Sequence, residues 1–196
     1  MSKEIEIRNE LFNEESVVNF FAEKGIAPSK SKHQIDTYYD NPDDSLFKDP
    51  DHVNTWIRIR EEDGKLSFTY KHWLPEGAEI RTYCEEKEYP MTSKQEISQH
   101  LKNLGLSTNF VPFIVTDKFR RCFMYRDCEI SIDEVKNLGT YIEIEYKGKN
   151  NNIDEVRNLL NEILTEIGAK VGPADYKGYA YHLFRMRNQG IKFDLN

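Results

Sequence analysis

The sequence has few of the residues expected of a disulfide-rich, metal-scaffold or membrane protein. Its 196 residues include three cysteines, Cys84, Cys122 and Cys128, an odd number without metal-ligand spacing. We expect these thiols to be reduced, as they are in cytosolic proteins. No apolar run approaches the ~20 residues that a membrane span needs, and residues 1–4 lead into charged sequence rather than a signal peptide. The sequence therefore predicts a cytoplasmic protein that has no membrane partner.

An excess of basic residues is also missing. Lys and Arg number 27 against 34 Asp and Glu, which gives a net charge of −7. Because nucleic-acid binders normally present a basic face, no nucleic-acid partner is expected. A hydrophobic content of 38% and an aromatic content of 12% indicate a folded chain. The length suits a single domain over residues 1–196, with a loose tail after about residue 187. The sequence leaves open whether the protein forms a homodimer.

What the sequence does contain is an unusual charge pattern in three short segments. Residues 4–8 (EIEIR), 56–60 (WIRIR) and 141–145 (YIEIE) alternate charged side chains with isoleucine. In a β-strand, successive side chains point to opposite faces, so each segment collects charges of largely one sign on one face. Like charges at this spacing repel one another. The pattern therefore predicts counter-charges, namely metal ions for the carboxylates and phosphates for the arginines.

Turn and periodicity signals divide the chain into strands with a few helices. Helices are predicted after Asn13, after Ser93 and over residues 153–167 and 176–186. A tight turn is predicted between the strands at 114–120 and 122–126. About eight strands at hairpin spacing favour an α+β protein in which an antiparallel barrel, or a strongly curved sheet, has helices packed outside. The predicted strands are 2–8, 33–40, 56–61, 66–72, 80–89, 114–120, 122–126, 128–135 and 141–147.

The isoleucine faces offer the apolar surface that amphipathic helices need, so the charged faces are expected to point inward. The alternative is a set of half-exposed strands whose charges are simply solvated. Side chains two residues apart on a strand are separated by roughly 6.6 Å. This spacing suits basic pairs that grip neighbouring phosphates, and carboxylate pairs that hold one hydrated Mg²⁺.

Several ordered motifs resemble those of one family. They are Glu4-x-Glu6-x-Arg8, the segment 36–40 (DTYYD), Arg58-x-Arg60, Lys71 after residues 68–70, Lys118-x-Arg120, Asp133, and Glu143-x-Glu145. Together they resemble the CYTH superfamily, the triphosphate tunnel metalloenzymes, over nearly the whole chain. Arg8 stands where many members have lysine. The strand at 81–88 has an ambiguous register, because either Arg81 with Glu85 or Glu86 with Glu88 could face inward.

This resemblance implies an eight-stranded antiparallel β-barrel, or tunnel, that binds a small molecule containing a triphosphate with Mg²⁺ or Mn²⁺. The implied catalytic pair is Lys71 with Tyr38, in which a lowered pKa allows Lys71 to take a proton. The alternative is that Lys71 is only one more phosphate contact. The implied substrate-binding residues are Arg8, Arg58, Arg60, Lys71, Arg81, Lys118 and Arg120. The implied metal ligands are Glu4, Glu6, Asp133, Glu143 and Glu145.

Three functions remain open at this point. The favoured one is hydrolysis of the terminal phosphate of inorganic triphosphate, thiamine triphosphate or a nucleotide. The second is that of a class IV adenylate cyclase, which converts ATP to cyclic AMP and pyrophosphate. The third is a polyphosphate-binding module without activity. The carboxylates Glu4, Glu6, Glu143 and Glu145 argue against this last function, because a binder of anions gains nothing from them.

Overall fold

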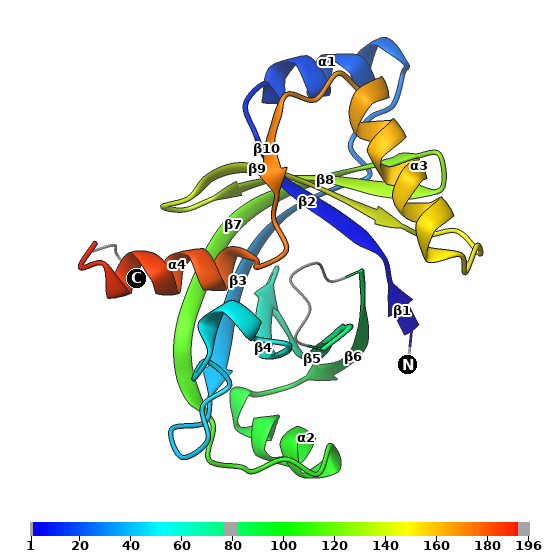
Figure 1. Cartoon of the computed structure of the whole chain (residues 1–196). Coiled ribbons are helices and arrows are strands. Elements are labelled where there is room, and N and C mark those ends of the chain that lie inside the picture. Colours follow the sequence, from blue (N-terminus) through cyan, green and yellow to red (C-terminus); the bar gives the residue numbers. More distant parts are fainter. Residues whose placement is uncertain (1, 77–81, 192–196) are drawn as a thin grey trace.

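One large antiparallel β-sheet with helices packed on it makes up the computed structural model, which describes residues 2–76 and 82–191 (Figure 1). The strands follow the order β1-β6-β5-β4-β3-β7-β8-β9-β2-β10. They are β1 (Ser2–Glu4), β2 (Glu6–Leu11), β3 (Lys30–Asp40), β4 (Thr55–Glu62), β5 (Lys65–Leu74), β6 (Tyr83–Met91), β7 (Val111–Tyr125), β8 (Cys128–Val135), β9 (Gly139–Tyr146) and β10 (Val171–Ala174). The helices are α1 (Glu14–Glu23), α2 (Ile97–Asn103), α3 (Ile153–Glu166) and α4 (Tyr179–Asn188), with 3₁₀ turns η1 (Pro50–His52) and η2 (Lys94–Glu96). This arrangement confirms the α+β prediction.

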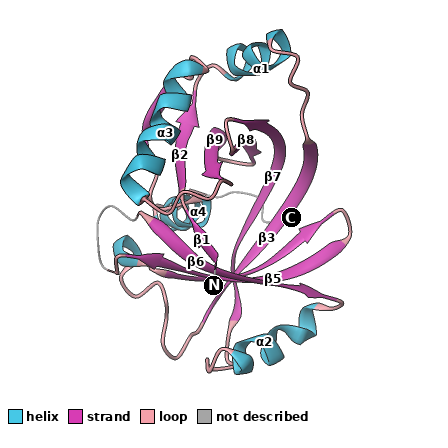
Figure 2. Cartoon of the chain, turned by 90° about the vertical axis from the view of Figure 1, so that its right-hand side faces the viewer, coloured by secondary structure: helices cyan, strands magenta, loops and turns pink. Residues whose placement is uncertain are grey.

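The first predicted strand is divided between the two sides of the sheet. Only Ile5 separates β1 from β2, yet β1 pairs with β6 and β2 pairs with β9. The long strands β3 and β7 curve from the β8–β9 part of the sheet to the β4–β5 part (Figures 1 and 2). The prediction of eight strands is wrong, because the described sheet has ten strands and its hydrogen-bonded order is open, from β1 to β10. The covalent chain through Ile5 links its two sides.

Two local errors account for part of the miscounted strands. The turn predicted between two strands near residue 121 is absent, because Arg121 stays in register with Ser31 of β3 and Ile132 of β8. The adjacent arginines Arg120 and Arg121 simply occupy opposite faces of the continuous strand β7. At the other edge, β10 forms against β2 in a stretch where no strand was predicted. Pro173 is tolerated there because an edge strand does not need every N–H group.

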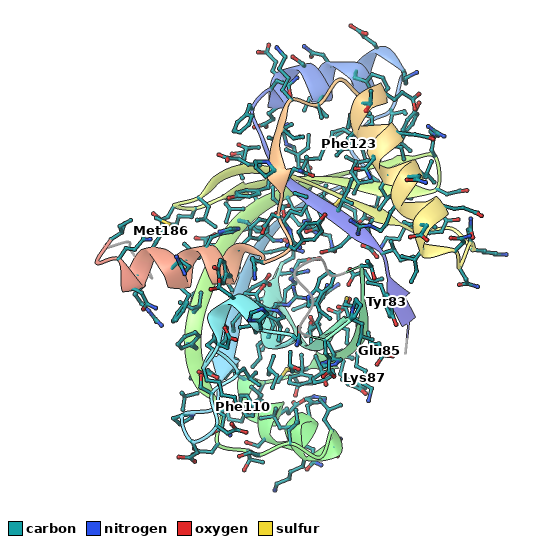
Figure 3. The ribbon with its side chains drawn as sticks, in the orientation of Figure 1. Tyr83, Glu85, Lys87, Phe110, Phe123 and Met186 are labelled. Atoms are coloured by element: carbon teal, nitrogen blue, oxygen red, sulfur yellow. The ribbon has the colours of Figure 1, made fainter. Side chains whose placement is uncertain are left out.

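The isoleucine faces lie under the helices, as the alternation predicts. Ile130, Ile132, Ile142 and Ile144 are essentially inaccessible and belong to one apolar cluster with Val17, Phe21, Val156, Leu160 and Ile163 of α1 and α3. Figure 3 labels Phe123, which belongs to the same cluster. A second cluster joins Ile57, Ile59 and Phe68 to Leu101 of α2. Full burial of each such side chain contributes about 1.5–3 kcal/mol, so the apolar faces fix the orientation of the charged ones.

The helices also follow local sequence signals. Asn152 caps α3, because its side chain accepts hydrogen bonds from the backbone N–H groups of Asp154 (3.1 Å) and Glu155 (3.2 Å). The capping box predicted at Ser93 is shifted, since the Glu96 carboxylate accepts from Thr92 N–H (3.2 Å) instead. Helix α4 begins at Tyr179, later than the predicted residue 176. In the described part of the chain, no helix combines the length and apolarity that crossing a bilayer requires.

Candidate functional site

The polar faces of the strands meet around a cavity of about 400 Å³. Asp133 lies behind the cavity wall with no exposed surface, and Arg81 lies outside the described residues. The cationic and acidic ladders therefore face one shared cavity rather than the outer surface of the sheet. The predicted site residues that line it are Glu4, Glu6, Arg8, Tyr38, Arg58, Arg60, Lys71, Lys118, Arg120, Glu143 and Glu145.

The first cationic group is arranged around Asp36 of β3. This carboxylate is 1% exposed and accepts hydrogen bonds from Arg60 Nε (2.7 Å) and Nη2 (2.8 Å) of the neighbouring strand β4. Arg58 Nη1 lies 3.4 Å from it. Burial alone would raise the pKa of Asp36, but Arg60 and Arg58 outweigh burial and hold that pKa well below its usual value. Asp36 therefore stays ionised and orients both guanidinium groups.

The second cationic group is arranged around Asp133 of β8. Its carboxylate accepts hydrogen bonds from Arg120 (2.7 and 2.6 Å), Lys118 Nζ (3.1 Å) and the hydroxyl of Tyr179 (2.9 Å). Burial, followed by the neighbouring charge of Arg120, lowers the pKa of Lys118 to about 8. Asp133 thus acts here as the counter-ion that holds Lys118 and Arg120 against the cavity.

Carboxylates collect on β2 and β9, next to the second cationic group in the order of the strands. Glu143 accepts from Arg8 Nε (3.0 Å) and Arg120 Nη2 (2.9 Å), and Glu6 accepts from Arg8 Nη2 (2.8 Å). Burial and the nearby charge of Glu143 raise the pKa of Glu6 to about 8. Burial and Glu4 raise the pKa of Glu145 to about 7. Arg8 alone therefore does not neutralise this group of carboxylates.

This carboxylate group fits a divalent cation by its chemistry. Hard cations such as Mg²⁺ take oxygen ligands, and Mg²⁺ commonly uses one or two carboxylates together with water and substrate phosphates. A bound divalent cation would relieve the repulsion that keeps protons on Glu6 and Glu145. Glu4, Glu6, Glu143 and Glu145 all line the same cavity, so the donors needed for such an ion are present.

Lys71 is placed differently from the prediction. Its Nζ lies 2.7 Å from Glu4 Oε2 and 3.3 Å from Glu86 Oε2. Burial would lower the pKa of Lys71, but the neighbouring acidic groups, Glu4 first, outweigh burial and raise it well above its usual value. The expectation of a lowered pKa is therefore wrong, because carboxylates rather than cations surround this amine. Lys71 in turn lowers the pKa of Glu4 to about 2 against the effect of burial.

Tyr38 lines the cavity, but among the hydrogen bonds of the described residues none joins it to Lys71. Its ring makes an edge contact with Trp56, with centroids 5.5 Å apart. Burial, followed by the charge of Asp36, raises the pKa of its hydroxyl. Tyr38 is therefore a neutral phenol in this structure.

Strand β6 settles the register that the sequence left ambiguous. Glu86 and Glu88 line the cavity, whereas Tyr83, Glu85 and Lys87 alternate with them and are labelled in Figure 3. The cavity-facing acids of this strand are Glu86 and Glu88 rather than Glu85. The Cys84 thiol donates to Glu4 (2.9 Å) from the adjacent β6 position.

Sequence reasoning missed other residues of the cavity wall. The inward position of Asp36 was recognised, but not its pairing with both arginines. Lys30 and Lys32 follow the same alternation on β3 and also line the cavity, a signal that was available. Tyr176, Lys177, Gly178 and Tyr179 line it as well. They precede or begin helix α4, and no strand alternation marks them. The sequence left open whether Tyr176 and Tyr179 cover one mouth of the tunnel or only anchor the last helix, and both line the cavity.

Comparisons with known proteins place these features in context. A family model described as the CYTH domain matches residues 2–174. A curated protein of Methanocaldococcus jannaschii named "Putative adenylate cyclase" is 34% identical over 162 residues, which cover 82% of this chain and 87% of that protein.

Two solved structures share the fold. The PH1819 protein of Pyrococcus horikoshii OT3 is 23% identical, has a TM-score of 0.69, and the match covers 94% of this chain and 99% of that one. A Hippeastrum protein is 21% identical with a TM-score of 0.64, over 100% of this chain and 99% of that one. It is described as a "Putative adenylyl cyclase" with a dominant triphosphatase activity. At these identities the likeness concerns the fold alone.

Proposed function

Because this chain belongs to the CYTH domain family, we propose that it is a divalent-metal-dependent enzyme that hydrolyses the terminal phosphate of a small triphosphate. The observation that carries this proposal is the meeting of two opposed charge groups at one cavity. Arg58, Arg60, Lys118 and Arg120 line it together with Glu4, Glu6, Glu143 and Glu145. A linear anion bound with a divalent cation complements both groups, and neither partner alone does so.

In this proposal the cationic groups bind and orient the phosphates. Arginine offers paired N–H donors to phosphate oxygens, and lysine offers a point charge. Asp36 and Asp133 hold these cations from behind, so that they face the substrate without reorganising. Fixed charges of this kind stabilise the negative charge that develops on the equatorial oxygens during phosphoryl transfer.

The metal would be held by the carboxylates Glu4, Glu6, Glu143 and Glu145 as Mg²⁺ or Mn²⁺. When bound, such an ion supplies charge neutralisation at the phosphate oxygens and a fixed orientation of the substrate. Of the described residues, three lysines with a shifted pKa line the cavity, namely Lys71, Lys118 and Lys147. Lys118, whose pKa is lowered to about 8, is the amine suited to accept a proton from attacking water near neutral pH, whereas the pKa values of Lys71 and Lys147 are raised. The curved sheet would act as a tunnel that limits access of bulk water to the phosphates.

A second candidate is supported by the 34% identical relative named as a putative adenylate cyclase. In that reaction the ribose 3′-oxygen of ATP attacks the α-phosphorus, the bond to the bridging oxygen breaks, and pyrophosphate leaves. The same charged groups would bind the triphosphate. The two reactions differ in which phosphorus atom is attacked, so their products distinguish them.

One incubation series tests both candidates. The purified protein is given Mg²⁺ or Mn²⁺ with inorganic tripolyphosphate, thiamine triphosphate or ATP, and phosphate, pyrophosphate and cyclic AMP are measured. We expect release of phosphate, and cyclic AMP with pyrophosphate would instead support the cyclase. Binding of tripolyphosphate without turnover of any substrate would refute both and leave the polyphosphate-binding module.

A matched pair of variants assigns the activity to this cavity. Glu143→Gln preserves the size of the side chain but removes a carboxylate from the cavity wall, and we expect turnover to fall at least about 100-fold. Glu134→Gln on the exposed face of β8 is the control, since its side chain is 58% exposed and lies outside the cavity. Equal turnover in the two variants would remove Glu143 from the site.

A further inference from the structure

The segment that follows β10 contributes to the phosphate site although it lies beyond residues 2–174, where the family match ends. Tyr176, Lys177, Gly178 and Tyr179 line the cavity. Helix α4, drawn in orange to red in Figure 1, then packs against β7, and its Ala180 and Leu183 belong to one apolar cluster with Trp56 and Ile114. The wall of the cavity is therefore completed by a segment that neither the family match nor strand alternation identifies.

Tyr179 occupies a central position in this segment. Its hydroxyl donates to Asp133 Oδ2 (2.9 Å), the same carboxylate that holds Lys118 and Arg120. Its ring centroid lies 5.0 Å from Arg8 Cζ and 5.0 Å from Lys118 Nζ. The Tyr179 side chain, which is 5% exposed, thus contacts the cations Arg8 and Lys118 and also Asp133, the counter-ion of the second cationic group.

The residues before Tyr179 hold Arg8 from its other side. Asp175 N–H donates to the Arg8 carbonyl oxygen (2.7 Å), and the Asp175 carboxylate lies 3.9 Å from Arg8 Nη1. Gly178 has φ +89°, and a Cβ atom there would lie 3.3 Å from Arg8 Nη1. The positive φ therefore favours glycine at this position, where a Cβ atom would also press on the Arg8 guanidinium.

We propose that Tyr179 is a positioning residue of the phosphate site. Its ring holds Arg8 and Lys118 near each other by cation–π attraction, and its hydroxyl fixes Asp133 beneath Lys118 and Arg120. Arg8 and Lys118 carry like charges, and the electron-rich ring face lowers the cost of keeping both beside one cavity. This inference rests on the proposed function in one respect, namely that these cations bind phosphate.

The binding test compares two changes at Tyr179 with one change on the same helix. Affinity for inorganic tripolyphosphate is measured by calorimetry without divalent metal. Tyr179→Leu removes the ring and the hydroxyl, and we expect binding about tenfold weaker. Tyr179→Phe keeps the ring and should bind within about threefold of the wild type. The control is Tyr181→Leu, because Tyr181 contacts Asp51 and Lys177 and does not line the cavity.

A crystal structure of Tyr179→Leu gives a second, independent measurement. We expect the Arg8 guanidinium and the Lys118 ammonium to leave their positions in this variant and to keep them in Tyr179→Phe. If wild-type protein binds no tripolyphosphate either with or without Mg²⁺, the proposed function fails, and the crystal structures alone then decide the positioning role. Unchanged cation positions in Tyr179→Leu would overturn the proposal. Equal affinity losses in the Leu and Phe variants would overturn the role of the ring, because both variants lack the hydroxyl that contacts Asp133.

Discussion

Replacing Asp36 with asparagine is a direct test of whether the cavity's cations depend on buried counter-ions. Asp36 is 1% exposed and receives two hydrogen bonds from Arg60, at 2.7 and 2.8 Å, with Arg58 at 3.4 Å. Asparagine has nearly the same shape but no charge, so two largely buried guanidinium groups lose their shared anion. Breaking a buried ion pair by removing one partner costs about 3–5 kcal/mol. For a chain of this size, that corresponds to a loss of about 6–20 °C in Tm.

The assay is urea unfolding followed by the fluorescence of Trp56 and Trp73, with Tm measured separately. Asp117→Asn is the matched control, because Asp117 pairs with His33 (2.7 Å) at positions 27% and 43% exposed. A surface pair of this kind contributes about 0–1 kcal/mol. Tripolyphosphate should stabilise Asp36→Asn more than the wild type, since it supplies anions to Arg58 and Arg60. A loss no larger than that of Asp117→Asn would refute the reasoning.

Two further predictions concern the titratable groups. Lys71→Arg should retain kcat within about tenfold, because Glu4 and Glu86 hold Lys71 as a cation. Lys118→Arg should lower kcat about 10²-fold or more, as loss of a general base does. If steady-state kinetics showed the larger loss in Lys71→Arg, Lys71 rather than Lys118 would be the base. Burial and the charge of Glu143 raise the folded-state pKa of Glu6 from its ordinary value of 4.5 to about 8, so its protonated form stabilises the fold at low pH and that contribution is lost as pH rises from about 4.5 through 8. In metal-free buffer, the free energy of unfolding of Glu6→Gln, relative to that of the wild type, should therefore increase from pH 5 to pH 8. A difference between the two proteins that does not change with pH would contradict the raised pKa.

Side-chain alternation allowed the orientation of the charged faces to be predicted. In segments 4–8, 56–60 and 141–145 each isoleucine must take the opposite face from each charge. The helices could cover only the apolar side, and Ile57, Ile59, Ile142 and Ile144 are buried beneath them. Period-two patterning is a local property, which is why one sequence was enough to recognise it.

Properties that depend on the partner strand could not be predicted in the same way. The pKa of Lys71 rises because β1 and β6 bring Glu4 and Glu86 beside it, and nothing near Lys71 in the sequence indicates this. The contact of Tyr179 with Asp133 joins positions 46 residues apart. The run Arg120–Arg121 was mistaken for a turn because two adjacent charges resemble a loop when neighbouring strands are unknown.

The position of Ile5 between β1 and β2 has a consequence for synthesis on the ribosome. Residues 2–11 are synthesised before their hydrogen-bonding partners β6, β9 and β10. Arg8 and Glu143, for example, are 135 residues apart. At translation speeds of about 5–20 residues per second, Arg8 waits roughly 7–27 s for Glu143 to be made. In the nascent chain, β2 therefore stays without its partner strands until β9 and β10 have been translated.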